Sequence, residues 1–322
     1  MIFFNKKDLA SVWKITLATF NGFLDDKGLK FSASLAYYTV FSLAPLMMLL
    51  IFILSIYFGH DAFEGKIYPE LKGFVGAEAA AQIQSIVKSV QLGKSVTAIT
   101  IGIVTLFIGA TGIFMEIQDS LNIIWRVKAK PKRGWVKMLT NRLLSFSLVI
   151  ALGFLLTVSL IINGLLAALA GRLSRFLSHF NFVFNLIDLG ITFLVIATLF
   201  GIIFKYLPDV KIRFKDVITG AVFTAILFML GKYLIGIYIG TMKISSTYGA
   251  AGSIIIIFVW IYYTSALLYL GAEFTQVYAE FTGRKIEPAD YAVAIEQKEI
   301  ERDVNHLPPQ NPDLKQNEPA KS

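Results

Sequence analysis

The amino-acid sequence predicts an all-α polytopic membrane protein with six transmembrane helices and both termini in the cytoplasm. Apolar residues make up 56% of the 322 residues, charged residues only 16%, and the mean hydropathy is +0.65. This composition excludes an ordinary soluble domain. Residues 250–272 contain no charged side chain, and a helix of that length crosses a hydrocarbon core of about 30 Å. Lysine and arginine residues cluster in alternate loops, which is typical of multi-pass membrane proteins.

Six apolar segments account for the membrane domain, residues 31–281. We place these spans at about 31–58, 96–115, 143–169, 182–204, 217–239 and 250–272. The first contains Pro45, which removes a backbone donor and predicts a kink. Residues 1–30 form a cytoplasmic amphipathic N-terminal segment. Residues 282–322 are polar and rich in proline toward their end, which predicts a disordered cytoplasmic tail.

The distribution of positive charge sets the predicted orientation. The segments before span one, after span two and after span four carry five, seven and four Lys or Arg residues, against four, two and one in the alternate loops. Short basic loops remain in the cytoplasm. The richest loop follows the second span and contains Arg126, Lys128, Lys130, Lys132, Arg133, Lys137 and Arg142. The apolar run 2–4 is too short for a cleavable signal peptide, so the first span is expected to act as an uncleaved anchor.

The N-terminal segment has a helical apolar stripe. Apolar side chains recur at spacings of three and four, at Leu9, Trp13, Leu17, Phe20 and Leu24. This pattern fits a helix that lies along the membrane surface. It fits equally well a helix whose apolar face is packed under the bundle.

Several kinds of chemistry lack the residues that they need. The chain has no cysteine, and its three histidines, His60, His179 and His306, are far apart. We therefore expect no disulfide, no thiol nucleophile, no metal site and no cofactor. A ribonuclease would need a metal site or an acid and base pair, and the basic loops are explained by topology without nucleic acid. The sequence does not indicate an enzyme or a nucleic-acid-binding protein.

Three polar residues lie at the same predicted depth in the outer half of the membrane. Asn163 is late in an outward span, Asp188 is early in an inward span, and Lys232 is late in an outward span. Polar groups inside a membrane usually face a bundle interior or a water-filled cavity. We therefore predict an ion pair between Asp188 and Lys232, with Asn163 nearby, lining a cavity open to the periplasmic side. Alternatively, Lys232 reaches the interface, Asp188 lies among the headgroups and Asn163 bonds a helix backbone.

Such a cavity suits an anionic lipid or amphiphile, since Lys232 offers one point charge to a phosphate. No nucleotide-binding glycine loop and no internal repeat is visible. The bilayer is the expected partner, and the oligomeric state stays open. Three functions are compared: transport or handling of an envelope amphiphile, a membrane scaffold that does not transport, and, far behind, a nuclease. Glu273, where the last span meets water, is expected to pair with a cation of the basic loop as a structural lock.

Four ordered segments carry a resemblance to a known family. They read LAYYTVFSLAPLMMLL from Leu35, LNIIWRV from Leu121, YLPDVKIRFKDVITGA from Tyr206 and YGAAGSIIIIFVWIYYTSALLYLGAEF from Tyr248. In these segments the chain resembles the YihY/BrkB family of bacterial inner-membrane proteins, over about residues 31–279. The family motif positions that we single out are Tyr37, Tyr38, Pro45, Pro208, Gly220, Tyr248, Gly249, Gly252, Gly271 and Glu273.

The resemblance implies six spans in the inner membrane, in agreement with the charge count. Members of the family once carried a ribonuclease BN label that is generally regarded as a misassignment. They also resemble proteins linked to serum resistance, virulence and the handling of envelope lipid or lipopolysaccharide. The resemblance therefore implies an envelope role more than it implies a defined activity.

Overall fold

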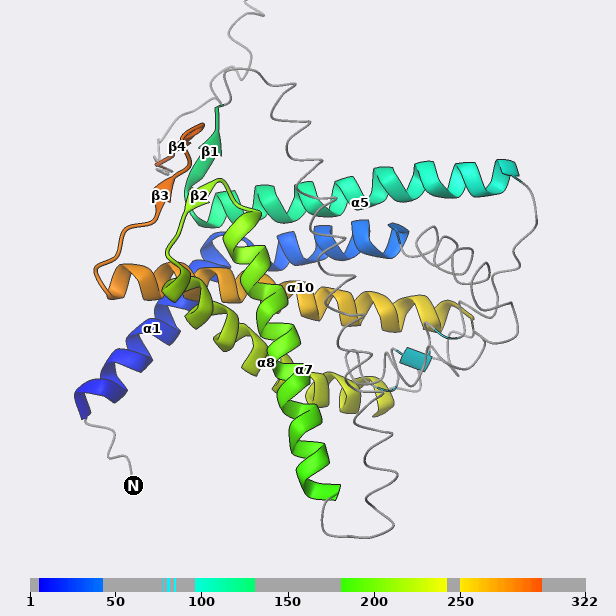
Figure 1. Cartoon of the computed structure of the whole chain (residues 1–322), viewed down its shortest axis with the longest axis horizontal. Coiled ribbons are helices and arrows are strands. Elements are labelled where there is room, and N and C mark those ends of the chain that lie inside the picture. The colour runs from blue at the N-terminus through cyan, green and yellow to red at the C-terminus, as the bar shows by residue number, and fades with distance from the viewer. Residues whose placement is uncertain are drawn as a thin grey trace, which may run out of the picture.

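A computed structural model describes residues 6–42, 96–130, 181–241 and 250–296, together with the single positions 77, 80, 81 and 84. This part of the chain is mainly helical (Figure 1). Its helices are α1 (Lys6–Asp25), a helix over residues 28–42, α5 (Val96–Ile124), α7 (Asn181–Tyr206), α8 (Phe214–Thr241) and α10 (Ala250–Phe281).

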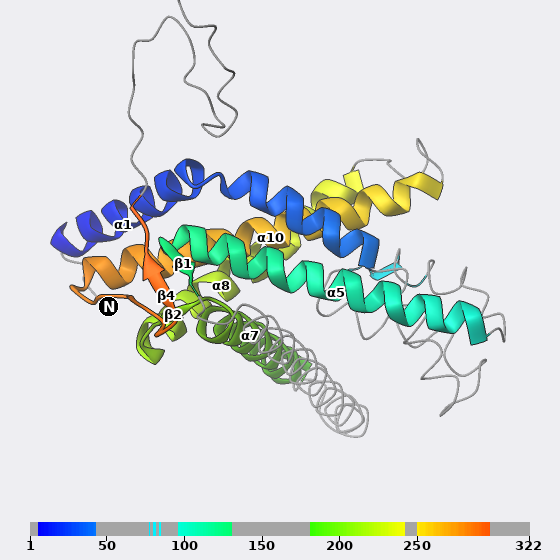
Figure 2. The same ribbon diagram turned by 90° about the horizontal axis from the view of Figure 1, so that it is seen from above.

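The helices pack in two directions. The helix over residues 28–42, α5 and α10 run side by side, and α7 points away from this group, as both views show (Figures 1 and 2). The helix α8 packs against both α10 and α7, and α1 packs against α10. The helix over residues 28–42 meets α5 closely, since a Cβ atom on Gly109 would lie 2.2 Å from Ser42 Oγ.

Four short strands gather at one end of the helices. Strand β1 (Val127–Ala129) pairs antiparallel with β4 (Ala292–Ala294), with Lys128 opposite Val293. Strand β2 (Val210–Lys211) pairs antiparallel with β3 (Glu287–Pro288). We call this end of the molecule the strand end. The ends of α5, α7 and α10 and the start of α8 all lie there, so the segments between helices are tied to the segment after α10.

The strands correct the first part of the prediction that residues 282–322 form a disordered tail, and they add short β pairs to the predicted all-α fold. Within residues 282–296, β3 and β4 are ordered by pairing with two loops. Strands of two or three residues are too short to show an alternating pattern of apolar and polar residues. The polar composition of the tail also resembles that of a disordered segment. The last helix also continues beyond the predicted span, to Phe281, where Gly283 (φ 69°) ends it. The Arg284 and Gly283 amides there donate to Ala279 and Glu280 carbonyls, as in a Schellman motif. Residues 297–322 lie outside the described part.

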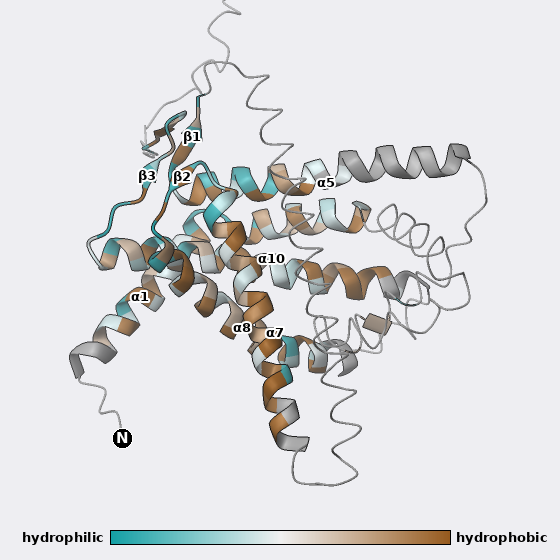
Figure 3. Ribbon diagram, in the orientation of Figure 1, coloured by the Kyte–Doolittle hydropathy of each residue, from teal (hydrophilic) through white to brown (hydrophobic). Residues whose placement is uncertain are grey.

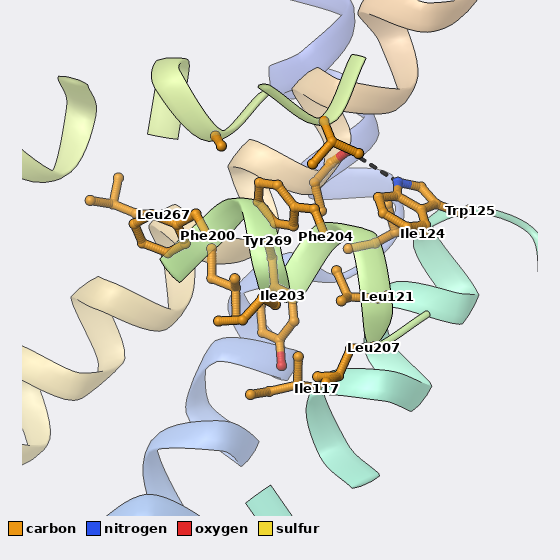
Figure 4. Packing of buried hydrophobic residues seen from close by; sticks show 14 of the residues in the cluster. Ile117, Leu121, Ile124, Trp125, Phe200, Ile203, Phe204, Leu207, Leu267 and Tyr269 are labelled. Carbon is orange, nitrogen blue, oxygen red and sulfur yellow. Dashed lines mark hydrogen bonds between the residues drawn. The ribbon is translucent and has the colours of Figure 1, made fainter. Parts of the chain in front are cut away.

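The hydrophobic core lies near the strand end. Figure 4 shows side chains of α5, α7 and α10 converging there, among them Leu121, Phe204 and Tyr269, whose exposed fraction is zero. The Trp125 indole N–H donates to the Ala272 carbonyl at 3.1 Å. This bond fixes the end of α5 against α10.

Three helices in the described part are long and apolar enough to cross a membrane. They cover Leu186–Tyr206, Phe214–Tyr238 and Ile254–Phe281, and Figure 3 shows their hydrophobic character. Large apolar side chains on α7 and α8 are exposed, such as Leu194 at 63% and Leu234 at 69%. An apolar surface of this kind indicates a lipid environment. The predicted span 96–115 lies within α5, whereas most of 31–58 and all of 143–169 fall outside the described residues.

Helices α8 and α10 approach through a reciprocal pair of contacts. A Cβ atom on Gly220 would lie 1.8 Å from Thr275 Oγ1, and one on Gly271 would lie 1.9 Å from Thr224 Oγ1. Each threonine hydroxyl donates to a carbonyl of its own helix, Thr224 to Gly220 and Thr275 to Gly271, both at 2.7 Å. Small residues four apart let membrane helices approach closely. Gly220 and Gly271 therefore set the α8–α10 spacing.

The apolar stripe of α1 points away from the bundle. Trp13, Leu17 and Phe20 are 68%, 48% and 53% exposed, whereas Thr19 and Phe23 are buried. The side of α1 that meets α10 is therefore the opposite one. This arrangement disagrees with a stripe packed under the bundle and leaves it available to a membrane surface.

Candidate functional site

Two of the three predicted cavity residues lie in the described part, on adjacent helices. Asp188 is exposed on α7, and Lys232 is half-buried on α8. Asp188 precedes the last residue of α7 by 18 positions, and Lys232 follows the first residue of α8 by 18 positions. At about 1.5 Å per residue, both lie about 27 Å from the strand end. Asn163 falls outside the described residues.

The structure brings these two charges into electrostatic range. The Asp188 carboxylate attracts the Lys232 ammonium, and Lys232 Nζ also lies 5.8 Å from the ring centroid of Tyr233. The cation therefore has both an acidic and an aromatic neighbour in this half of the helix pair.

An apolar cleft of about 320 Å³ lies between α7 and α8 at the same depth. Its lining residues are Leu186, Leu189, Gly190, Phe193, Ile226, Met229 and Leu230. Neither Asp188 nor Lys232 is among them, so the two charges predicted to line a cavity do not line this cleft. Both charges are nevertheless within one helical turn of lining residues.

A second polar cluster at the strand end joins α1, α5 and α10. Asp26, at the corner between α1 and the next helix, binds the Arg126 guanidinium at 2.6 Å. The Asp26 carboxyl group also hydrogen-bonds with that of Glu273 on α10. Both acids are buried, with exposed fractions of 8% and 3%. Burial raises the pKa of Asp26, while Arg126 acts in the opposite direction. The basic-loop cation expected beside Glu273 is thus present, but it pairs with Asp26, which contacts Glu273.

A third cluster surrounds Asp209 in the connection between α7 and α8. Its carboxylate, which is almost fully buried, accepts hydrogen bonds from Gln118 at 3.0 Å, Asn122 at 2.9 Å and the Tyr291 hydroxyl at 3.0 Å. The Asp209 amide donates to Asn122 Oδ1 at 2.8 Å. Burial, together with Asp209, raises the pKa of Tyr291 to about 12. This cluster connects α5, the α7–α8 connection and the C-terminal strands, and its polar groups satisfy one another.

An ion pair beside this cluster anchors the start of α8. Asp216, in the first turn, pairs with Arg284 after the end of α10. An acid in the first turn also interacts favourably with the helix dipole. Together with the pairing of β2 and β3, this ion pair joins the start of α8 to the segment after α10.

The remaining motif residues are divided between the surface and the interior. Tyr37 and Tyr38 are exposed, at 54% and 40%, and Tyr38 packs near Gly112. Pro208 and Gly252 are buried. Pro208 follows the last turn of α7, which a proline cannot extend. Pro45, Tyr248 and Gly249 fall outside the described residues.

Sequence reasoning missed Asp26, Asn122, Asp209 and the Asp216–Arg284 pair. Asn122, Asp209 and Asp216 lie inside the quoted family segments. Polar residues within these largely apolar segments could have indicated a buried polar cluster. Asp26 had no such sign, because it precedes the first motif. In the described ranges, no group of three His, Asp or Glu residues could hold a metal ion. His60, His179 and His306 all lie outside these ranges.

The long apolar helices, the exposed apolar surface and the polar clusters at one end define a helical integral membrane protein. Residues 19–294 match the virulence factor BrkB family, and the chain belongs to this family of bacterial membrane proteins.

Relatives in other bacteria carry membrane-protein or ribonuclease-like names. A UPF0761 membrane protein of Azotobacter vinelandii is 27% identical over 79% of this chain and 60% of its own length. A UPF0761 membrane protein of Vibrio vulnificus is 26% identical over 76% of both chains. A protein of Bacillus subtilis named as ribonuclease-like, YfkH, is 28% identical over 75% of this chain and 86% of its own. The chain thus spans about 60% of the length of the Azotobacter relative. No solved structure matches the chain.

Proposed function

We propose that this chain transports or otherwise handles an anionic lipid or amphiphile of the bacterial envelope. The observation that carries the proposal is the apolar cleft between α7 and α8, which lies within one turn of Lys232. A cleft with purely apolar walls fits an acyl chain, and a nearby cation fits a headgroup phosphate. Asp188 would hold the Lys232 ammonium in place while the cleft is empty. When the amphiphile binds, its headgroup would replace Asp188 as the partner of Lys232.

The proposed orientation places the strand end in the cytoplasm, within a six-span topology. Exposed cations gather there, which supports this orientation under the positive-inside rule. They include Lys27, Lys30, Lys128, Lys130, Lys211, Arg213, Lys215 and Lys285. The cleft and the Asp188–Lys232 pair then belong to the outer half of the membrane.

Lipid translocation in proteoliposomes tests the activity. Purified protein would be reconstituted with a fluorescent anionic phospholipid whose outer-leaflet copies can be quenched. We expect protein-dependent translocation that Lys232→Gln reduces at least several-fold. Gly190→Phe should reduce it as well, since a Cβ atom on Gly190 meets nothing within 4 Å and a larger side chain would fill the cleft. Lys211→Gln at the strand end is the matched control. Equal rates in all variants would contradict the proposal.

Cysteine labelling tests the location, and the absence of native cysteine makes it clean. Single cysteines at Asn163, Asp188 and Lys232 should react in intact cells with a membrane-impermeant thiol reagent, and a lipid headgroup analogue should slow the reaction. A cysteine at Asp290, in the exposed connection between β3 and β4, should react only after the membrane is permeabilised. If the first three stay unreactive, a scaffold without a cavity fits better. Metal-dependent RNA cleavage by the pure protein would instead favour a nuclease.

A further inference from the structure

Two buried carboxyl groups contact each other at the strand end. The side chains of Asp26 and Glu273 lie within hydrogen-bonding reach of each other, and both residues are more than nine-tenths buried. Ionised carboxylates are acceptors only, so two of them cannot form a hydrogen bond. A proton on one of the two groups makes the contact favourable, as in other sites that two carboxyl groups share.

The surrounding charges do not replace that proton. Arg126 contacts Asp26 and acts on Glu273 from further away. Asp25 lies near Asp26, and Glu280 lies near Glu273, so both add negative charge. One guanidinium thus faces two buried acids and two further acids. One positive charge balances one buried carboxylate, and the second stays neutral most readily by holding a proton.

Glu273 belongs to a row of polar side chains along one face of α10. Glu273 Oε1 is buried and has no hydrogen-bond partner in the described part of the chain. Tyr269, Glu273, Gln276 and Glu280 follow one another at spacings of four, three and four, which places them on one face of the helix. The Gln276 amide donates to Glu280 at 3.2 Å, and Glu280 is exposed. This face connects the buried pair with the surface.

We propose that Asp26 and Glu273 form a proton-binding site, in which one exchangeable proton lies between the two carboxyl groups and reaches solvent along the polar face of α10. A metal cation fits less well, because three or more acidic or histidine ligands do not gather anywhere in the described ranges. Arg126 already occupies one Asp26 oxygen. The proposal does not depend on the amphiphile assigned above.

Loss of the proton would act on a corner of the fold. Asp26 lies next to Lys27, whose backbone has a positive φ of 59°, between α1 and the helix over residues 28–42. A Cβ atom on Gly22 of α1 would lie 2.9 Å from Glu273 Oε2. Two buried carboxylates so close, with one guanidinium paired to Asp26, repel each other. Deprotonation is therefore expected to move the α1 corner away from α10.

Infrared difference spectroscopy of the full chain in lipid nanodiscs tests the site. The carbonyl stretch of a protonated carboxylic acid is separate from the carboxylate bands. Wild-type protein should show this stretch at pH 7, with a shift in D₂O, and should lose it in alkali. Glu273→Gln and Asp26→Asn should each abolish it at pH 7, because the remaining carboxylate then pairs with Arg126. Asp25→Asn, next to the site but exposed, should keep it.

Each result decides the proposal. If the wild-type spectrum at pH 7 lacks the carbonyl stretch of a protonated acid, the proposal is overturned without any variant. If the carbonyl stretch persists in Glu273→Gln or in Asp26→Asn, the proton is held by one isolated acid, and the shared site is overturned. The spectra do not depend on translocation, so a negative lipid assay does not affect the proton-binding site. A negative spectrum likewise does not affect the proposed lipid transport.

Discussion

Asp209 has polar partners from two separate segments, Gln118 and Asn122 on α5 and Tyr291 before β4. In Asp209→Asn, one carboxylate oxygen becomes an amide donor that faces Asn122 or Gln118, both of which donate. Asn122 cannot turn to accept, since its own oxygen already binds the Asp209 amide. A buried polar group without its partner costs about 1–3 kcal/mol. We expect a lower thermal unfolding midpoint in detergent or nanodiscs.

The matched control for Asp209 is Asp290, which also lies at the strand end. Its side chain is 87% exposed and pairs with Lys211 on the surface. Exposed pairs contribute about 0–1 kcal/mol, so Asp290→Asn should change the midpoint little. Equal effects of the two substitutions would show that the Asp209 hydrogen bonds do not stabilise the fold.

Individual residues were predictable from the sequence where their effect is local, and not where a distant segment supplies the partner. The position of Glu273 at the end of an apolar helix indicated a need for a partner, and Arg126 of the basic loop acts on it while pairing with Asp26. The intervening acid, Asp26, lies 247 positions away in the sequence, and no spacing rule connects the two. The same holds for Tyr291 and Asp209.

At the scale of helices, the α8–α10 contact is sensitive to a single methyl group. Gly220→Ala and Gly271→Ala would place a Cβ atom within 2 Å of a threonine hydroxyl on the other helix. Overpacking of this kind costs about 1–3 kcal/mol. Both substitutions should lower the unfolding midpoint, whereas Gly190→Ala on α7 should not, because its Cβ atom meets nothing within 4 Å. Indistinguishable midpoints in all three variants would mean that the two helices can separate without cost.

The orientation of α1 leads to a prediction about its surroundings. A cysteine at Leu17 lies on the exposed apolar stripe, and one at Ala18 lies on the flank of the same turn. An environment-sensitive fluorophore at position 17 should report a more apolar medium in nanodiscs than one at position 18. In a short-chain detergent this difference should shrink. Equal emission in nanodiscs would place the stripe in water.

The helices were predictable because their apolar character extends over many residues. The predicted spans 182–204, 217–239 and 250–272 coincide with α7, α8 and α10 to within a few residues, apart from the longer end of α10. The strands were not predictable. Each has two or three residues, and their pairing depends on contacts between loops that are far apart in sequence.

For the molecule as a whole, the raised pKa of Asp26 predicts how stability depends on pH. Because the folded state binds this proton more tightly than the unfolded chain, the stabilisation is present below the ordinary pKa of 3.8 and is lost as the pH rises through the higher pKa of the folded state. Wild-type protein should therefore lose stability relative to Asp26→Asn as the pH rises above 3.8. Unfolding midpoints over a pH series measure this difference. Parallel curves for the two proteins would contradict it.

The pairing of β1 and β2 with residues 287–294 also sets an order of events during synthesis. The loops after α5 and α7 leave the ribosome long before their strand partners, which come after the last helix. Until then these loops have unpaired backbone groups, and Asp209 lacks the hydroxyl of Tyr291. The strand end can therefore be completed only after all of α10 and the residues that follow it have been synthesised, so in a nascent chain that stalls before residue 287 the ends of the earlier helices are not yet joined.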